Sequence, residues 1–300
     1  MWQQLLRKLI TGDVKALARI ISLVENKAPG YEEILTTLPT SLTPVLGITG
    51  PPGAGKSTLV DALIKEIVAA GKRVGVLCVD PSSPFNLGAL LGDRIRMSEW
   101  YNNPSVFIRS LATRGSLGGL HPMIIEITDI MKAAGFDYII VETVGVGQSE
   151  IEIAGLADTT VVVVVPEGGD EVQTMKAGLM EIADIFVVNK ADRPGADIFF
   201  KNLKLMLAPA FSKQVNEIPI IKTVASQRTG IDELFKKIEL HQQQQVYSNK
   251  HNWLLTEKAY HLIMQKRMGD INKDELKKKI EQVLVEKPDF NLYRFIGEIE

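Results

Sequence analysis

From about residue 45 to residue 245 the chain alternates between two hydrophobic patterns. Short, unbroken apolar runs rich in β-branched residues are separated by stretches whose apolar positions recur at helical spacing. Unbroken runs are typical of strands buried on both faces of a parallel sheet. The predicted strands are 45–49, 74–79, 106–108, 138–141, 160–165, 185–188 and 218–224, and the predicted helices are 56–70, 119–134, 171–181, 196–208 and 231–245.

This alternation predicts an α/β fold with a doubly wound, mostly parallel sheet. Helical patterns flank it on both sides, so we expect three parts: a helical extension over 1–40, a main domain over 41–246 and a helical segment over 247–300. Residues 252–268 and 272–286 carry apolar stripes that need a covering surface. Either they pack back on the main domain or they form a dimerisation arm.

Composition excludes several classes of function. The 300 residues are 45% hydrophobic and carry a net charge of −2, so no basic field recruits nucleic acid or an anionic membrane. Cys78 is the single cysteine, which excludes an intramolecular disulfide and a cysteine metal cage. The strongest apolar run, 161–165, is far shorter than the about 20 residues of a membrane span. With no signal-peptide pattern either, we expect a cytoplasmic protein.

A glycine-rich run falls between the predicted strand 45–49 and the predicted helix 56–70. Its spacing matches the loop that cradles nucleotide phosphates through backbone N–H groups at a helix N-terminus. Lys56 is expected to reach the β- and γ-phosphates, and the Ser57 hydroxyl to ligate Mg²⁺. The predicted phosphate-binding residues are Gly50, Pro51, Pro52, Gly53, Ala54, Gly55, Lys56, Ser57 and Thr58.

A second short run, Asn189-Lys190-Ala191-Asp192, follows the predicted strand 185–188. An Asp192 carboxylate accepts hydrogen bonds from N1–H and N2–H₂ of guanine, whereas adenine presents a different donor and acceptor pattern. Lys190 is expected to lie along the base plane. Ser226, Gln227 and Arg228 follow the next strand and would add a backbone N–H contact to the base. The two runs together predict GTP as the ligand.

Acidic residues end two further predicted strands. Asp80 and Glu142 are candidates for a Mg²⁺ site, because Mg²⁺ prefers oxygen ligands and takes only one or two carboxylates. The alternative for each is a carboxylate solvated at a strand end. Glu142-Thr-Val-Gly145 has the layout of a GTPase switch with Glu in place of Asp, and Gly145 N–H would contact the γ-phosphate. Gln148 either orients the attacking water or caps the next helix, and Asp93 could join the metal shell.

Several strings together carry a family resemblance. They are Gly50-Pro-Pro-Gly-Ala-Gly-Lys-Ser-Thr58, Asp80-Pro-Ser-Ser-Pro84, Gly92-Asp-Arg94, Arg114-Gly-Ser-Leu-Gly-Gly119, Glu142-Thr-Val-Gly-Val-Gly-Gln-Ser-Glu150 and Asn189-Lys-Ala-Asp192. With them the chain resembles the MeaB/ArgK family of P-loop GTPases over about residues 40–245.

The resemblance implies a Mg²⁺-dependent enzyme that hydrolyses GTP to GDP and phosphate. It implies a G-protein chaperone that gates adenosylcobalamin loading and protects a B12-dependent acyl-CoA mutase, most often methylmalonyl-CoA mutase. It also implies a homodimer formed through the C-terminal helices. Asp80, Asp93 and Glu142 then correspond to the metal-site acids, and Lys176 to a lysine of a third switch.

Two alternatives remain at this point. The first is a nucleotide-dependent regulatory subunit of another assembly, such as an accessory ATPase or GTPase of a transport system; the guanine motif argues against the ATPase form. The second is a nickel-insertion GTPase. That function favours clusters of histidine and cysteine, and the four histidines here are scattered beside one cysteine. Isobutyryl-CoA mutase and related acyl-CoA mutases are alternative clients.

Overall fold

The computed structural model describes most of the chain in two compact units, Met1–His251 and Asn252–Glu300, which we treat separately. The described residues are 2–80, 97–113, 120–143, 149–166, 177–211, 218–243, 249–268, 273–286 and 290–297.

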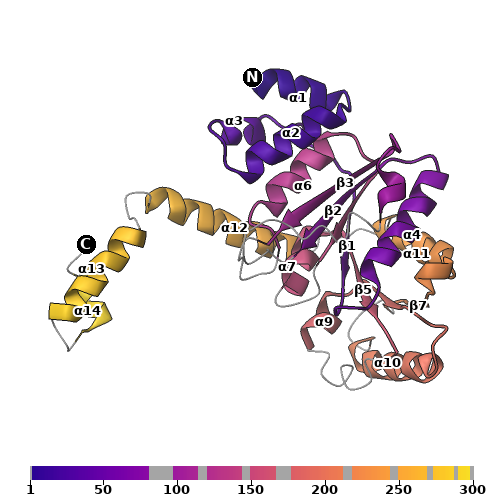
Figure 1. Ribbon diagram of the computed structural model, residues 1–300. Coiled ribbons are helices and arrows are strands. Elements are labelled where there is room, and N and C mark those ends of the chain that lie inside the picture. Colours follow the sequence, from indigo (N-terminus) through magenta and orange to yellow (C-terminus); the bar gives the residue numbers. More distant parts are fainter. Residues whose placement is uncertain are drawn as a thin grey trace. The chain divides into compact units, whose positions relative to one another are not determined.

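A seven-stranded sheet forms the centre of the first unit (Figure 1). Its order is β3-β2-β4-β1-β5-β6-β7, and every neighbouring pair is parallel. The predicted α/β fold with a doubly wound parallel sheet is therefore confirmed. The strands are β1 (Val45–Thr49), β2 (Val74–Asp80), β3 (Val106–Ala112), β4 (Tyr138–Glu142), β5 (Thr159–Val164), β6 (Ile185–Val188) and β7 (Ile220–Lys222).

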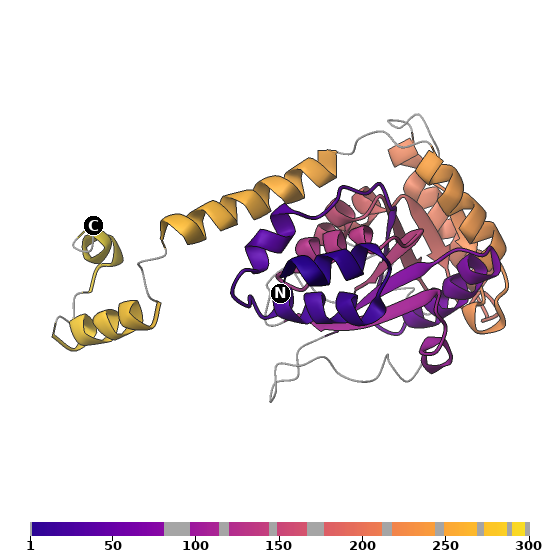
Figure 2. The same ribbon diagram turned by 90° about the horizontal axis from the view of Figure 1, so that it is seen from above.

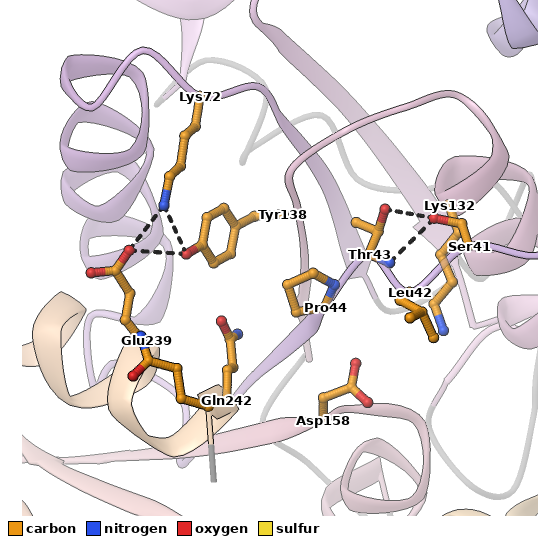
Figure 3. Close-up of a pocket in the computed structure, with 11 residues that line it drawn as sticks. Ser41, Leu42, Thr43, Pro44, Lys72, Lys132, Tyr138, Asp158, Glu239 and Gln242 are labelled. Carbon is orange, nitrogen blue, oxygen red and sulfur yellow. Dashed lines mark hydrogen bonds and ion pairs between the residues drawn. The ribbon is translucent and has the colours of Figure 1, made fainter. Parts of the chain in front are cut away.

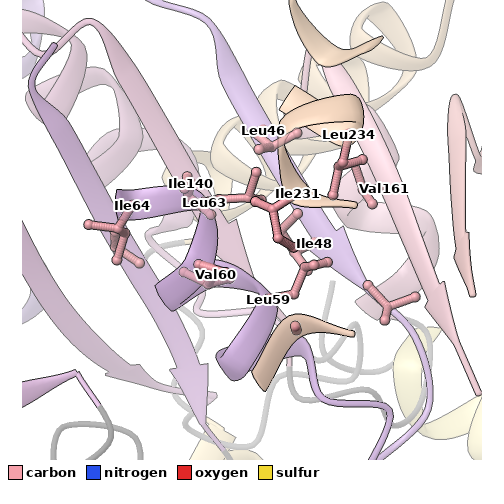
Figure 4. Packing of buried hydrophobic residues seen from close by; sticks show 14 of the residues in the cluster. Leu46, Ile48, Leu59, Val60, Leu63, Ile64, Ile140, Val161, Ile231 and Leu234 are labelled. Atoms are coloured by element: carbon pink, nitrogen blue, oxygen red, sulfur yellow. The ribbon is translucent and has the colours of Figure 1, made fainter. Parts of the chain in front are cut away.

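Helices cover both faces of the sheet. On one face, α4 (Lys56–Ala69) and α11 (Ile231–Gln243) pack through Leu59, Leu63 and Leu234 on Ile48 and Ile140 of the strands (Figure 4). The other face carries α6 (Ile124–Ala133), α7 (Ser149–Leu156), α9 (Ala177–Ile182) and α10 (Ala196–Phe211). The two apolar layers explain why the strand sequences are unbroken runs rather than alternating ones.

The first three helices, α1 (Trp2–Ile10), α2 (Val14–Glu25) and α3 (Tyr31–Thr36), form a layer beside α6 (Figure 2). Gly12 and Asp13 separate α1 from α2, and the Asp13 carboxylate accepts a hydrogen bond from Ala16 N–H at 2.9 Å, which caps α2. Arg109 of β3 donates to Glu25 of α2 at 2.8 Å. The N-terminal helices are thus held to the sheet by charge as well as by apolar packing.

Some element boundaries differ from those predicted. Helix α6 begins at Ile124 rather than near 119, after a turn in which His121 Nδ1 accepts from Met123 N–H at 3.0 Å. Strand β7 is limited to Ile220–Lys222: Pro219 has no N–H to extend the ladder at its start, and Val224 pairs with Thr229 instead of with β6. Helix α7 lies outside the predicted helix ranges, since its eight residues are too few to show a clear period, although a helix after Gln148 is part of one hypothesis for that residue.

The second unit contains most of α12 (Asn249–Arg267), with α13 (Lys273–Glu286) and α14 (Leu292–Gly297). Large apolar side chains are exposed along these helices, among them Trp253, Tyr260, Ile263, Leu284 and Tyr293. Within the part of the chain that the structure describes, no helix has the length and apolar character needed to span a membrane.

Gly230, which precedes α11, provides a test of the turn after β7. Its φ is +76°, and an added Cβ would lie 2.2 Å from the Lys222 carbonyl oxygen. Gly195 has a similar φ of +83° but no atom within 4 Å of the added Cβ, so it is the matched control. We expect Gly195→Ala to lower the free energy of unfolding by about 1 kcal/mol from backbone strain, and Gly230→Ala by about 3 kcal/mol because a backbone clash is added. Urea unfolding measures the free energy of unfolding of both variants. Equal losses in the two variants would contradict the close approach of Gly230 to the Lys222 carbonyl oxygen.

Candidate functional site

The predicted site residues gather where the parallel strands end. Glu142, the last residue of β4, pairs in register with Ile48 of β1 and Cys78 of β2, and Val188 of β6 pairs with Val164 of β5. The loops after β1, β2, β4 and β6 therefore all leave the sheet on the side where the carboxyl ends of the strands lie, which we call the carboxyl edge. This is the edge at which open α/β sheets bind ligands.

Three glycines shape the loop between β1 and α4. Gly50, Gly53 and Gly55 have φ values of +138°, +76° and +88°, a range that disfavours other residues. A Cβ on Gly50 would lie 2.0 Å from the Val163 carbonyl oxygen, and one on Gly55 2.4 Å from Asn189 Nδ2. The same atom on Gly53 would meet nothing within 4 Å. Gly50 and Gly55 therefore permit close packing, whereas Gly53 lies on the open side of the loop.

Lys56 and Ser57 begin α4 and are both buried. Lys56 Nζ donates to the Gly50 and Pro51 carbonyl oxygens at 2.9 and 3.0 Å, so the amine folds over its own loop. Ser57 Oγ donates to Glu142 Oε1 at 2.7 Å. Asp80 is buried at the end of β2. A hydroxyl and two carboxylates are hard oxygen ligands, so the chemistry of this donor set fits Mg²⁺.

The loop after β6 contacts the loop after β1 through two side chains. Asn189 Nδ2 donates to the Ala54 carbonyl oxygen at 2.9 Å, and Lys190 Nζ donates to the Gly53 carbonyl oxygen at 2.8 Å. Asn189 is 2% exposed, whereas Asp192 is exposed at the surface. The two motifs predicted to bind one nucleotide are thus in direct contact.

The segment after β7 joins the same cluster. Asn189 Oδ1 accepts from Thr223 Oγ1 at 3.0 Å and from Ala225 N–H at 3.1 Å. Ala225 begins the short helix η2 (Ala225–Gln227). Ser226 and Gln227 of this helix and Arg228, which follows it, are exposed.

Other predicted site residues lie outside the described part of the chain: Asp93, Gly145, Gln148 and Lys176. The structure also shows a buried pair to which the sequence analysis assigned no role. Thr49 Oγ1 and Thr143 Oγ1 are 2.9 Å apart, at the ends of β1 and β4. The location of both residues at strand ends was visible in the sequence, but nothing in the pattern indicated that they meet.

A cavity of about 450 Å³ lies at the opposite edge of the sheet (Figure 3). Pro44, Tyr138 and Asp158 line it, and they stand at or just before the starts of β1, β4 and β5. Lys72 Nζ donates to Glu239 Oε1 at 2.9 Å on one wall, and burial raises the pKa of Tyr138 beside them. Because strand starts and strand ends are on opposite edges, this cavity is separate from the predicted nucleotide site.

Comparisons with known proteins agree with this geometry. The family model described as methylmalonyl-CoA mutase-associated GTPase MeaB matches residues 17–281. A Pyrococcus horikoshii protein with a provisional GTPase name is 53% identical over 243 residues, which cover 79% of this chain and 77% of that one. The fused isobutyryl-CoA mutase of Geobacillus kaustophilus is 38% identical over 237 residues, covering 74% of this chain and 22% of that much longer protein.

Among solved structures, one described as LAO/AO transport system kinase is similar over 99% of this chain and 95% of its own, with a TM-score of 0.69 and 25% identity. The family model covers the described sheet, the loop at Gly50–Ser57 and the loop at Asn189–Asp192. The chain therefore belongs to the MeaB family and is a P-loop GTPase.

Proposed function

We propose that the chain is a GTP-hydrolysing chaperone of a B12-dependent acyl-CoA mutase in the cytoplasm, with methylmalonyl-CoA mutase as the client. One observation supports the proposal that the chain binds GTP. Asn189 and Lys190 donate hydrogen bonds to the Ala54 and Gly53 carbonyl oxygens, at 2.9 and 2.8 Å. These hydrogen bonds fix a loop with guanine-reading chemistry against a loop with phosphate-binding chemistry. One GTP molecule can therefore contact both.

The phosphate end of the site is proposed to use residues that are already buried. Lys56 would exchange its carbonyl partners, Gly50 and Pro51, for the β- and γ-phosphates, since an ammonium gains more from an anion than from neutral oxygens. Ser57, Asp80 and Glu142 would hold Mg²⁺, which neutralises phosphate charge when bound. Asp93, Gly145, Gln148 and Lys176 are proposed to complete the site from the segments after β2, β4 and β5.

The association with a mutase is supported by two findings about relatives. The matching family is described as methylmalonyl-CoA mutase-associated. In the Geobacillus relative, a segment 38% identical to this chain is part of a protein named as an isobutyryl-CoA mutase. Fusion of two activities in one chain favours a physical partnership between the separate proteins. We propose that the client of this chain is a mutase of that acyl-CoA class.

The second unit is proposed to form a homodimer. Trp253, Leu255 and Ile263 of α12 are 49%, 42% and 52% exposed, and α14 exposes Tyr293 at 86%. Exposed apolar side chains on these helices gain free energy when a second copy covers them. The boundaries 1–40, 41–246 and 247–300 stay our proposal for the functional division of the chain.

Lys56→Ala is expected to lower the rate of GTP hydrolysis by about 10²-fold, because one preorganised cation is lost from the phosphates. Lys65→Ala is the control, since Lys65 is an exposed lysine on the same helix. Phosphate release from GTP measures the rate, and circular dichroism checks that both variants fold. Unchanged hydrolysis by Lys56→Ala would remove this lysine from the reaction.

Asp192→Asn is expected to weaken GTP binding by about 10–100-fold and to favour xanthosine triphosphate. The amide presents a donor where guanine also presents donors, whereas xanthine offers a carbonyl oxygen. Asp232→Asn, an exposed acid at the start of α11, is the control. Titration calorimetry with both nucleotides measures the preference. Equal affinities of Asp192→Asn and wild type for GTP would contradict the base-reading role.

The partnership is tested by capture from the native cytosol, with the full-length chain immobilised. We expect a cobalamin-dependent mutase to be recovered, in an amount that changes when a non-hydrolysable GTP analogue is added. The Lys56→Ala variant should show a reduced nucleotide effect. Recovery of the same proteins with and without the analogue, with no mutase among them, would overturn the chaperone proposal and leave the GTPase activity untouched.

A further inference from the structure

Two buried threonines meet beneath the phosphate-binding loop. Thr49 is the last residue of β1 and Thr143 follows the last residue of β4; they are 0% and 2% exposed. Their hydroxyl oxygens are 2.9 Å apart although the residues are separated by 94 positions. Thr143 N–H also donates to the Ile48 carbonyl oxygen at 3.0 Å. Thr143 is therefore tied to β1 through both its backbone and its side chain.

This pair and the Ser57–Glu142 hydrogen bond hold the end of β4 from opposite faces of the sheet. Successive side chains of a strand point to opposite faces. Glu142 points to the face that carries α4, where it accepts from Ser57 at 2.7 Å. Thr143 points to the other face, on which Gly47 of β1 meets Ile153 of α7. A tilt of the chain at residues 142 and 143 would break one of the two contacts.

The contributions of the two threonine hydroxyls to stability depend on each other. A buried hydroxyl that loses its partner retains its full desolvation cost. Replacement of both hydroxyls by apolar groups of the same shape, in contrast, changes the free energy of unfolding little. Valine has nearly the shape of threonine and favours strands. Single and double valine replacements therefore separate an effect on folding from an effect on the position of Glu142.

We propose that Thr49 is a positioning residue of the GTPase reaction, which acts through Thr143 to fix the Glu142 carboxylate. The proposal rests on the proposed role of Glu142 in the nucleotide site. The hydroxyl of Thr49 keeps Thr143 in line with β1, so that Glu142 stays within hydrogen-bond distance of Ser57. Correct placement of such a group has a large effect on rate, because a shift of about 1 Å can cost a rate factor of about 100.

The test compares Thr49→Val, Thr143→Val and the double variant in the full-length chain. Each single variant leaves one buried hydroxyl without its partner, so we expect a melting temperature lower by about 3–6 °C. The double variant should recover most of that loss. Its kcat for GTP should nevertheless stay about tenfold below that of the wild type, and the Mg²⁺ concentration for the half-maximal rate should rise. GTP binding measured by calorimetry should change little.

Two further variants serve as controls. Thr49→Ser keeps the hydroxyl, so its kcat should be close to that of the wild type. Thr160 of β5 pairs in register with Gly47, and its buried hydroxyl has no hydrogen-bond partner within the described residues. Thr160→Val therefore removes a buried threonine hydroxyl on the same face without removing a contact. It should leave kcat unchanged, and its melting temperature should be equal to or higher than that of the wild type, because an unpaired buried hydroxyl is lost.

Recovery of both kcat and melting temperature in the double variant would overturn the proposal, because the pair would then matter only for folding. A loss of kcat in Thr49→Ser equal to that in Thr49→Val would overturn it as well. Failure of the proposed function is recognised separately. In that case the wild-type protein would fail to hydrolyse GTP or to bind it at the Glu142 edge, whatever the threonine variants do.

Discussion

The side-chain amide of Asn189 joins three loops that come from distant parts of the chain. Its nitrogen donates to Ala54 of the phosphate-binding loop, and its oxygen accepts from Thr223 and from the N–H of Ala225. Because this amide is 2% exposed, each of the three hydrogen bonds replaces a water contact that is unavailable there. Loss of any one would leave a buried polar group unsatisfied. Asn189 is therefore the one side chain among the described contacts that joins all three segments, and the Lys190 to Gly53 and Ala191 to Thr223 hydrogen bonds each support one pair of them.

A parallel sheet fixes where its loops begin but not where they go. The described ladder between β1 and β4 ends at Thr143 N–H and Ile48 O, and side chains add contacts at that point. Ser57 holds Glu142 on one face, and Thr49 holds Thr143 on the other. Asn189 does the same for the loop after β6. Short polar contacts at strand ends thus convert a common fold into a defined site.

The strands and the glycine-rich loop were predictable from the sequence, because each depends on residues that are neighbours along the chain. β-Branched runs gave the seven strands, and the glycine spacing gave a loop whose φ values are indeed positive at Gly50, Gly53 and Gly55. What could not be predicted involves partners far apart in sequence. Thr49 and Thr143 are ordinary strand residues until the order β4-β1 brings them together. Likewise, the guanine motif placed Asn189 in the nucleotide site, but nothing in the sequence indicated its hydrogen bonds to Ala54, Thr223 and Ala225.

Asn189 and Asp192 differ in burial, which suggests different roles for them within the loop that we propose to bind the base. Asn189 is enclosed and hydrogen-bonded to protein, so it sets the position of the loop in the described structure. Asp192, three residues later, is exposed, and an exposed carboxylate is satisfied by water. Its hydrogen bonds discriminate strongly between bases only when a bound base displaces that water, because a mismatched base then leaves the carboxylate unpaired. The proposed role of Asp192 in guanine recognition therefore requires that the bound base displace water from an exposed carboxylate, which the buried Asn189 amide anchors from behind.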